Sequence, residues 1–478
     1  MPTQFEQLKN VVKALQTIPD CRPVSVGGSV RDAIIATGTT LLDSHNLQQQ
    51  LELTAKDFDL EVFGASSAHV YAVLQKAGIG LELVGRAFPV YKVKGYNIDI
   101  SFPRRENKTG DGHTDFSIVI DAGMPFEEAA LRRDFTCNAI GYDWNSGEIV
   151  DPYGGVNAIM YKVLDPVSPK FKEDALRVLR CFKFISRLGF KPTGLTMAYS
   201  WEIVEGLKNY AYERLVPEWI DFILHSRPGY IKYAMEFLNH SNLNRYIFTE
   251  LSEIVGIPQH PDHHPEGTVD LHTIHCLEYF AKNVRDTLAN NEEKLIVGLA
   301  VLCHDLGKAT HTTNDERGIK SIGHEDSPRC REFLSRLFAP TDKRIDEIEL
   351  LVKAHMRPMD LFKHKSGLPA IRRLNIAVNG RIDRLLKVVE CDQGGRPPKP
   401  VNLEGIAWVL DKSKELNLDT KTVIKPIIQG RHLITHLNLK PSKIFTPILA
   451  TMFEEQLDGV FNNEEEGIKR LIACYRVE

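Results

Sequence analysis

Apolar positions divide the chain into a mixed first part and a helical remainder. Residues 5–16 place apolar side chains at the three- and four-residue spacing of an amphipathic helix. Short apolar runs then predict five strands, at residues 23–26, 58–62, 90–93, 97–101 and 138–142. From about Pro166 the pattern is helical to the end of the chain. The sequence therefore predicts an α+β fold, in which a mixed sheet with helices precedes all-α domains.

Stretches rich in proline and glycine mark breaks within the helical remainder, at residues 227–229, 256–267 and 394–400. A chain of 478 residues also suggests about three domains, on a prior of roughly 150 residues each. We expect a head (1–165), a helical neck (166–255), a helical middle domain (256–400) and a helical tail (401–478). The polar, glutamine-rich residues 39–53 are expected to form a surface loop.

Composition limits the class of protein. With 43% hydrophobic residues the chain has ample material for several packed cores, which excludes a disordered or fibrous protein. A formal net charge of −4 excludes a globally basic coat for nucleic acid. A polyanionic partner would therefore have to bind to local basic patches. Residues 169–191 provide one candidate, with seven Lys or Arg against two acids, although such a run can also be a solvated helix face.

Cysteine spacing and the longest apolar run bear on the location of the protein. The eight cysteines form no Cys-x-x-Cys pair, which favours free thiols in a reducing compartment over a zinc ribbon or a disulfide scaffold. The longest apolar run, Leu295–Cys303, is nine residues, too short to span a bilayer. No secretory signal is visible at the N-terminus. We therefore expect a cytoplasmic protein without a membrane partner.

Two carboxylates stand two residues apart near one predicted strand. Residues so spaced point to the same face of a strand, so Asp57 and Asp59 should project together, away from Phe58 and Leu60. Such a pair suits Mg²⁺ shared with substrate phosphates, and two such ions can clamp the attacking and leaving oxygens of a phosphoryl displacement. Asp99 is a candidate for a third carboxylate. The alternative is a solvent-facing edge strand that binds no metal.

A double glycine follows the first predicted strand and opens a predicted helix. Gly27 and Gly28 would let the backbone approach a phosphate closely, and the N–H groups at the start of a helix favour anions. By itself the motif favours a structural turn. Because the carboxylate pair follows it, a phosphate-binding site becomes the preferred hypothesis over a structural turn.

Together these segments resemble a known family. Gly-Gly-Ser-Val-Arg-Asp (27–32) followed by Asp-Phe-Asp-Leu-Glu-Val (57–62) resembles the nucleotidyltransferase head of the DNA polymerase beta superfamily, specifically the class II tRNA nucleotidyltransferase/poly(A) polymerase family. Three further segments match that family's motifs in order: Pro-Arg-Arg-Glu (103–106), Arg-Arg-Asp-Phe-Thr-Cys-Asn-Ala-Ile (132–140) and Lys-Glu-Asp-Ala-Leu-Arg-Val-Leu-Arg (172–180). One departure is the 25-residue spacing from Asp32 to Asp57, which is longer than is usual in the family.

The resemblance implies roles for particular residues. Asp57 and Asp59 would be the catalytic pair, with Mg²⁺ as their cofactor. The implied nucleotide-binding residues are Gly27, Gly28, Arg31, Asp32, Arg132, Arg133, Asp134, Asn138, Asp174, Arg177 and Arg180.

Asp174 and Arg177 are the candidates for choosing the base. We expect a helix from Glu173 to Arg187, with a buried stripe of Leu176, Leu179 and Phe182. Residues three apart on a helix share a face, so the acceptors of Asp174 and the rigid donor fork of Arg177 could together pair with the Watson–Crick edge of a base. The alternative is an ordinary ion pair on a helix surface, which an isolated Asp-x-x-Arg would favour. The resemblance reverses that preference.

Histidines and aspartates of the middle domain occur in the order His, His-Asp, Asp, which resembles the HD phosphohydrolase superfamily. The metal ligands implied are His272, His304, Asp305 and Asp392, with His324 and His355 as candidates for a second metal. Imidazole with carboxylate suits a divalent transition metal such as Mn²⁺, Ni²⁺ or Fe²⁺. Three other histidines, His260, His263 and His275, are expected on loops or helix surfaces. The alternative is a domain that keeps the HD shape without activity.

Some bacterial members of the tRNA nucleotidyltransferase family carry an HD domain after the neck, and this chain resembles them. Residues 429–434 and 439–442 are similar to the family's C-terminal segment that lies against tRNA. The implied activity is template-independent addition of C and A residues, from CTP and ATP, to tRNA 3′ ends, with release of pyrophosphate. Two alternatives stay open: an A-adding enzyme or poly(A) polymerase, and an HD phosphohydrolase whose head only binds RNA. No oligomeric state is predicted.

Overall fold

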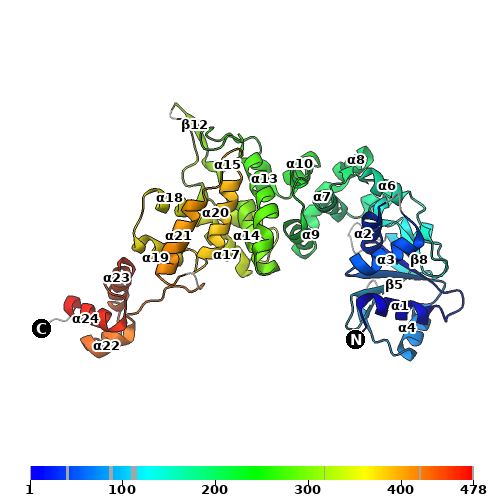
Figure 1. Ribbon diagram of the computed structural model, residues 1–478, viewed down its shortest axis with the longest axis horizontal. Helices are drawn as coiled ribbons and strands as arrows, with labels where there is room; N and C mark the ends of the chain where they lie inside the picture. The colour runs from blue at the N-terminus through cyan, green and yellow to red at the C-terminus, as the bar shows by residue number, and fades with distance from the viewer. Residues whose placement is uncertain are drawn as a thin grey trace. The chain divides into compact units, whose positions relative to one another are not determined.

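The computed structural model describes residues 2–38, 42–84, 90–108, 116–316, 318–418 and 421–475. The chain divides into two compact units, whose elements are labelled in Figure 1. Unit 1 comprises Met1–Asn209 with His240–Leu243, and unit 2 comprises Tyr210–Asn239 with Asn244–Glu478.

Unit 1 is built on a mixed sheet of seven strands. In spatial order these are β3 (Leu81–Val84), β4 (Val90–Val93), β5 (Ile98–Ser101), β2 (Phe58–Phe63), β1 (Arg22–Val26), β8 (Gly141–Asp143) and β9 (Ile149–Val150). Only β2 and β5 pair in parallel, and the other neighbours are antiparallel. The first four predicted strands agree with β1, β2, β4 and β5 to within one residue at each end.

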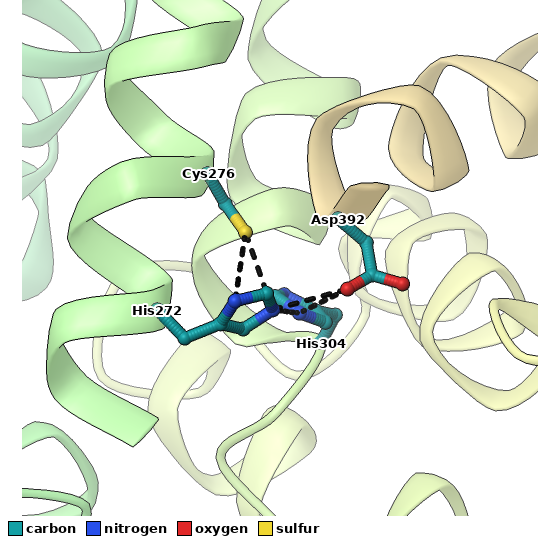
Figure 2. A group of neighbouring side chains, drawn as sticks. All are labelled: His272, Cys276, His304 and Asp392. Carbon is teal, nitrogen blue, oxygen red and sulfur yellow. Dashed lines mark hydrogen bonds and ion pairs between the residues drawn. The ribbon is translucent and has the colours of Figure 1, made fainter. Parts of the chain in front are cut away.

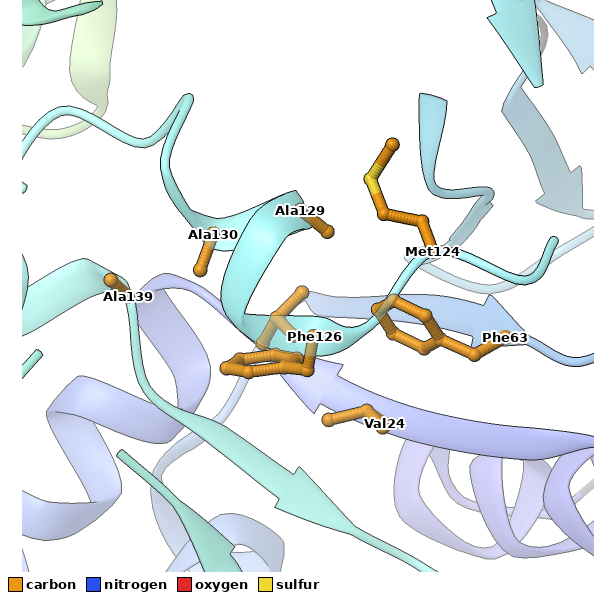
Figure 3. Close-up of a cluster of buried hydrophobic side chains, with 8 residues drawn as sticks. Val24, Phe63, Met124, Phe126, Ala129, Ala130 and Ala139 are labelled. Atoms are coloured by element: carbon orange, nitrogen blue, oxygen red, sulfur yellow. The ribbon is translucent and has the colours of Figure 1, made fainter. Parts of the chain in front are cut away.

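The helices that cover the sheet are α1 (Gln4–Leu15), α2 (Gly28–Thr37), α3 (Ser44–Thr54), α4 (Ser67–Lys76), α5 (Phe126–Ala130), η2 (Thr136–Asn138) and α6 (Gly155–Tyr161). Figure 1 shows α1 and α4 on one side of the sheet and α2 and α3 on the other. Under α5 lies an apolar cluster in which Phe126 packs between Phe63 and Val24 (Figure 3). This cluster fixes the segment before residue 132 against β1 and β2.

Two predictions for the head are wrong. The predicted strand at 138–142 is a 3-10 turn, η2, followed by a strand that begins only at Gly141. Most of the predicted loop at 39–53 is the helix α3, while residues 39–41 lie outside the described residues. The helix forms because Asp43 caps its N-terminus and because Leu47 and Leu51, one turn apart, are fully buried where α3 packs on α2.

The remainder of unit 1 is mainly helical: η3 (Pro169–Glu173), α7 (Leu176–Leu188), α8 (Gly194–Ile203) and η4 (Val204–Asn209). Two short sheets, β6 (Arg104–Lys108) with β7 (Phe116–Ile120) and β10 (Val163–Leu164) with β11 (Lys191–Pro192), belong to the same unit, and the sequence pattern indicated none of these four strands.

The predicted helix from Glu173 begins three residues late, at Leu176. Asp174 has extended backbone angles (φ −136°, ψ 106°), and its carboxylate accepts a hydrogen bond from the Leu176 N–H at 3.0 Å. Asp174 therefore precedes the helix, whose N-cap is Ala175. Leu179 and Phe182 are buried as predicted, whereas Leu176 is only half-buried.

Unit 2 consists of helices and one small hairpin. Its elements are α9 (Tyr212–His225), α10 (Ile231–His240), α11 (Leu243–Tyr246), α12 (Thr249–Glu253), α13 (Val269–Tyr279), η5 (Phe280–Val284), η6 (Arg285–Thr287), α14 (Asn291–Cys303), α15 (Lys308–His311), β12 (Thr313–Asp315), β13 (Gly318–Lys320), η7 (His324–Asp326), α16 (Arg329–Leu334), α17 (Lys343–Ala354), α18 (Arg357–Lys363), α19 (Leu368–Ala377), α20 (Ile382–Gly394), α21 (Leu403–Glu415), α22 (Gly430–Leu437), α23 (Phe445–Asp458) and α24 (Glu464–Tyr475).

Helix α14 is the centre of this bundle. Every residue from Leu295 to Cys303 is buried, because α14 packs against α9, α13, α17 and α20. A helix surrounded on all sides reads as a continuous apolar run. None of the described helices is long and apolar enough to cross a membrane. All eight cysteines are free thiols, as the sequence predicts.

Candidate functional site

A concavity of about 500 Å³ in unit 1 opens beside the central strand β2. The predicted residues that line it are Gly27, Gly28, Arg31, Asp59, Arg132, Arg133, Asp134, Asn138, Asp174, Arg177 and Arg180. Two predicted residues are outside this lining: Asp57 directly precedes β2, and Asp32 accepts a hydrogen bond from Arg31 Nε at 2.8 Å. The lining carries seven basic side chains against three acidic ones, which makes it a binding surface for an anion.

The register of the sheet places carboxylates side by side. Asp59 on β2 is the backbone partner of Asp99 on β5, and Phe58 and Leu60 on its two sides are buried as predicted. Burial removes water from Asp59 and raises its pKa; Arg133 opposes this effect, while Asp99 and Asp57 add like charge that raises the pKa further. Repulsion of this kind is relieved by a bound cation, and the all-oxygen donor set fits Mg²⁺.

Gly27 brings the start of α2 against these carboxylates. Its φ of +77° is in the left-handed region, and a Cβ at this position would lie 3.1 Å from the Asp59 Oδ2 atom. A side chain would therefore disturb both the turn and the carboxylate. Because the N-terminus of a helix favours anions, phosphate oxygens and a cation on Asp59 can be neighbours here.

Glu61, on the same strand, is fully buried and anchors two arginines of the lining. Arg132 Nη2 donates to its carboxylate at 2.6 Å and Arg133 Nη2 at 3.1 Å. Burial alone would raise the pKa of Glu61, but Arg133 and Arg132 hold it below its usual range. The two guanidinium groups are thereby fixed at the edge of the concavity.

Asp134 is the centre of a second buried network. Its carboxylate accepts hydrogen bonds from Arg180 Nε at 2.7 Å and from Asn138 Nδ2 at 2.8 Å, and Arg31 Nη1 donates to Asn138 Oδ1 at 2.6 Å. Burial raises the pKa of Asp134, but Arg180 and these hydrogen bonds lower it to about 2. The network connects three of the sequence motifs, at 27–32, 132–140 and 172–180, in one rigid wall.

Replacing Asp134 should make the head less stable at neutral pH. A carboxylate whose pKa is depressed on folding stabilises the fold above its unfolded pKa of 3.8, and this contribution is lost as the pH falls towards about 2. Asp134→Asn should therefore lower the free energy of unfolding by about 2 kcal/mol at pH 7 and by much less near pH 2. Urea unfolding at several pH values measures this, with the exposed Glu82→Gln on β3 as control. An equal loss at both pH values would contradict the assignment.

Asp174 and Arg177 both line the concavity although only Arg177 is in the helix. The Arg177 guanidinium donates to the Lys170 carbonyl oxygen at 2.6 Å and to that of Arg132. Their proximity thus follows from the turn before α7, not from a shared helix face.

Three polar or aromatic side chains of the lining were not predicted: Lys183, Phe184 and Arg187. They continue the face of α7 that carries Arg180, and the Arg31 guanidinium lies 4.9 Å from the centre of the Phe184 ring. Their three- and four-residue spacing after Arg180 was the available signal.

In unit 2 the four predicted HD ligands come together. His272 is on α13, His304 and Asp305 follow α14, and Asp392 is near the end of α20 (Figure 2 shows all but Asp305). His272 Nε2 lies 3.0 Å from Asp392 Oδ1 and 3.3 Å from His304 Nε2, and His304 Nε2 lies 3.3 Å from Asp305 Oδ2. Donors bonded to one ion at about 2.0–2.3 Å lie roughly 3–3.7 Å apart. His272 Nε2 has this spacing to Asp392, to His304 and to Asp305 (3.6 Å), whereas His304 Nε2 and Asp392 Oδ1 are slightly farther apart, at 3.9 Å. The donors of the four residues are therefore close to the spacing of ligands on one metal ion.

The imidazole rings are oriented for metal binding. In each case Nδ1 contacts a backbone carbonyl oxygen: His272 that of Gly395 (3.1 Å), His304 that of Val301 (2.8 Å), His324 that of Ser321 (2.7 Å) and His355 that of Val352 (2.6 Å). A carbonyl oxygen can only accept a hydrogen bond, so the ring proton must be on Nδ1. The lone pair of Nε2 is then available to bind an ion.

Asp305 connects this group to the second pair of candidates. Its Oδ1 lies 3.1 Å from His324 Nε2 and 4.0 Å from His355 Nε2, while its Oδ2 faces His272 and His304. Both Asp305 oxygens and His324 Nε2 are buried without a partner in hydrogen-bond geometry among the described residues. Buried polar atoms usually have a hydrogen-bond partner, so their exposure to the cluster is consistent with two bound ions that share Asp305 as a ligand.

Two cations border the cluster. Lys308 Nζ lies 2.8 Å from Asp305, and Arg396 Nη2 lies 2.5 Å from Asp392. Burial would raise the pKa of Asp305, but His304 and Lys308 hold it well below its usual range. A cavity of about 510 Å³ opens onto these groups, so an anionic substrate can meet metal ligands and cations together.

Two residues of this site were missed. Glu266 Oε1 lies 2.8 Å from Nδ1 of both His264 and His272, and Cys276 Sγ lies 3.4 Å from His272 Nε2. Cys276 is one helical turn after His272, a His-x-x-x-Cys spacing that a search for Cys-x-x-Cys pairs cannot detect. The expectation for His260 and His263 is correct, since both lie in the loop before α13.

Two family models match the chain. The Poly A polymerase head domain matches residues 24–165, and the HD domain matches residues 262–388. The first contains the carboxylates of β2, and the second contains the cluster of His272, His304 and Asp305.

Two relatives and one solved structure resemble the chain over long stretches. A multifunctional CCA protein of Xylella fastidiosa (strain 9a5c) is 33% identical over 62% of this chain, which spans 66% of that protein, just under two thirds. Another of Acinetobacter baumannii (strain SDF) is 30% identical over 78% of this chain and 84% of its own length. The fold is similar to the crystal structure of the Bacillus stearothermophilus CCA-adding enzyme in complex with CTP, with a TM-score of 0.66 at 21% identity over 99% of this chain and 98% of that one.

Proposed function

Because the chain belongs to the tRNA nucleotidyltransferase (CCA-adding enzyme)/poly(A) polymerase family with an HD domain, we propose that it adds C and A residues from CTP and ATP to tRNA 3′ ends. One observation carries the proposal: nucleotide-binding residues from three separate motifs line one cation-rich concavity beside the Asp59 carboxylate. The proposal includes a cytoplasmic location and the division into head, neck, HD domain and tail at residues 165, 255 and 400.

In the transfer reaction the protein contributes little covalent chemistry. The 3′ hydroxyl of the RNA attacks the α-phosphorus of the nucleotide, and pyrophosphate leaves. Mg²⁺ held by Asp57 and Asp59 would supply neutralisation of the charge on the reacting oxygens. Arg132 and Arg133, fixed by Glu61, are placed to bind the triphosphate, and the wall around Asp134 keeps Asn138 and Arg180 in position. Positioning and electrostatics thus supply most of the catalysis.

We assign base selection to Asp174 and Arg177. The hydrogen bond from the Leu176 N–H to Asp174 and the carbonyl contacts of Arg177 hold both side chains at the wall of the concavity. A carboxylate and a guanidinium offer acceptors and donors at fixed separation, so a protein surface can replace the template strand.

Arg177→Ala should weaken the choice of nucleotide more than it weakens RNA binding. A good bidentate contact to a base provides about 1–3 kcal/mol of discrimination, so misincorporation of UTP and GTP should rise roughly 10- to 100-fold. Single-turnover incorporation of each nucleotide measures the change, and Lys191→Ala, an exposed charge on β11, is the matched control. Unchanged misincorporation in Arg177→Ala would show that Arg177 does not select the nucleotide.

The HD domain is proposed to hydrolyse phosphate esters with a divalent transition metal such as Mn²⁺, Ni²⁺ or Fe²⁺. Such an ion, when bound, supplies Lewis-acid activation of the ester and of water. His272, His304, Asp305 and Asp392 would hold it, and Lys308 and Arg396 would neutralise the phosphate. Four imidazole rings present Nε2 to the cluster, and this arrangement favours a metal-binding domain over an HD domain without activity.

A panel of RNAs separates the proposal from a poly(A) polymerase and from an HD phosphohydrolase whose head only binds RNA. The protein is incubated with tRNA ending in CC and with an unrelated RNA, each with ATP alone. One A on the tRNA and none on the other RNA supports a tRNA-specific enzyme. Repeated addition to both would identify a poly(A) polymerase, and no addition to either would favour an HD phosphohydrolase whose head only binds RNA.

A further inference from the structure

Cys276 is a buried thiol in the HD cluster, and the proposed function gives it no role. It lies on α13 one turn after His272, and Figure 2 shows its sulfur directed toward the ring of His272, between the helix and the group formed by His304 and Asp392. Its Sγ lies 3.4 Å from His272 Nε2, and donor atoms of Cys276, His272, His304 and Asp392 all lie within 4.8 Å of one another. All four residues are buried.

These distances suit a shared ion. For bond lengths of about 2.1 Å to nitrogen and 2.3 Å to sulfur, two donors on one ion lie roughly 3.1–3.6 Å apart. The separation of Cys276 Sγ from His272 Nε2 falls in this range, as does that of the two histidine Nε2 atoms, 3.3 Å. A second, independent observation is that both oxygens of Asp305, which faces the same histidines, are buried without hydrogen-bond geometry to any partner in the described part of the chain.

The backbone holds the sulfur in place. Gly395, just after α20, packs so closely that a Cβ there would lie 2.2 Å from Cys276 Sγ, and its carbonyl oxygen accepts from His272 Nδ1. The thiol and the imidazole are therefore positioned by the same residue.

We propose that Cys276 is a further ligand of the HD-site metal ion, and that it makes the site selective for thiophilic divalent ions such as Zn²⁺, Co²⁺ or Fe²⁺ over Mg²⁺. The inference rests on the proposed metal site of the HD domain. On binding, the thiol gives up its proton to solvent and the sulfur lone pair forms the bond to the ion. Sulfur ligands select soft ions, whereas carboxylate and water favour Mg²⁺ and Mn²⁺.

Cobalt provides a test that does not depend on activity. The full-length protein is titrated with Co²⁺, and the near-ultraviolet charge-transfer band of a cobalt–thiolate bond is recorded with the affinity. The wild type should show the band. Cys276→Ser should lose it and bind Co²⁺ at least about tenfold more weakly, with a smaller change for Mn²⁺. Cys330→Ser, a buried cysteine of α16 outside the cluster, should keep the band, and Cys276→Ala with circular dichroism checks that the fold survives.

The possible results are distinct. Binding of Co²⁺ by the wild type without the band would overturn the role of Cys276 and leave the proposed HD site standing. A band that persists in Cys276→Ser would also overturn it, since another thiol would be its source. Absence of Co²⁺ and Mn²⁺ binding in the wild type would refute both the ligand assignment and the proposed metal-dependent HD activity.

Discussion

Asp59→Asn is expected to reduce nucleotide addition by about a thousandfold or more while the protein stays folded. The carboxylate faces the concavity and stabilises little, because its pKa is raised by lost hydration and by Asp99 and Asp57. Its loss removes a negatively charged oxygen ligand, and stabilisation by a bound cation amounts to several kcal/mol of the barrier. Asp57→Asn should have a similar effect. Steady-state addition of CTP to tRNA lacking CCA measures both.

The control for these variants is Glu82→Gln, an exposed carboxylate on β3 of the same sheet, which should keep wild-type activity. Asp99→Asn is informative because Asp99 is the direct neighbour of Asp59. A partial loss would identify it as a third carboxylate of the site. Retention of more than a few per cent of activity in both Asp57→Asn and Asp59→Asn would refute the assignment of the catalytic pair.

Asp305→Asn is expected to abolish hydrolysis by the HD domain and leave CCA addition within about twofold of wild type. Asp305 contacts both His304 and His324, so its charge acts on both groups of ligands. The head and HD sites belong to different units and share no ligand residue, and mutations without shared partners usually act independently. Asp59→Asn should show the reverse pattern. The measurement is both activities on both variants, with phosphate monoesters, phosphodiesters and tRNA bearing a 2′,3′-cyclic phosphate as HD substrates.

Folding must be checked in this comparison, because Asp305 is buried and neutralises Lys308. Circular dichroism and thermal unfolding serve that purpose, and Glu404→Gln, an exposed carboxylate of α21, is a control that should keep hydrolysis. Loss of both activities from a folded Asp305→Asn protein would show that the two sites are coupled. No hydrolysis by the wild type with any metal or substrate would favour the inactive HD domain.

The family and the α+β fold were predictable because they depend on local patterns. Alternation along residues 57–61 put Asp59 opposite the buried Phe58 and Leu60, and the structure has that arrangement. The family prediction is confirmed by the relatives and the two domain models. Each of these features is decided by neighbouring residues, which a sequence displays directly.

Errors arose where tertiary contacts decide the local structure. The polar composition of residues 39–53 favours a loop, but Leu47 and Leu51 are enough to bind a helix to α2. The start of α7 was predicted three residues early because the side chain of Asp174 replaces a backbone partner, which spacing alone cannot reveal. Glu266 joins the HD cluster because the loop before α13 returns to His272, whereas Cys276 follows His272 by one turn of α13 and had a local signal in its spacing.

Sequencing of the reaction product tests whether C, C and A are added in order to a tRNA end. A tRNA that lacks CCA is incubated with CTP alone, ATP alone, or both, and the 3′ ends are sequenced. We expect two C residues with CTP alone, no addition with ATP alone, and CCA with a stop when both are present. A product with A residues only, or a tail that continues past CCA, would contradict it.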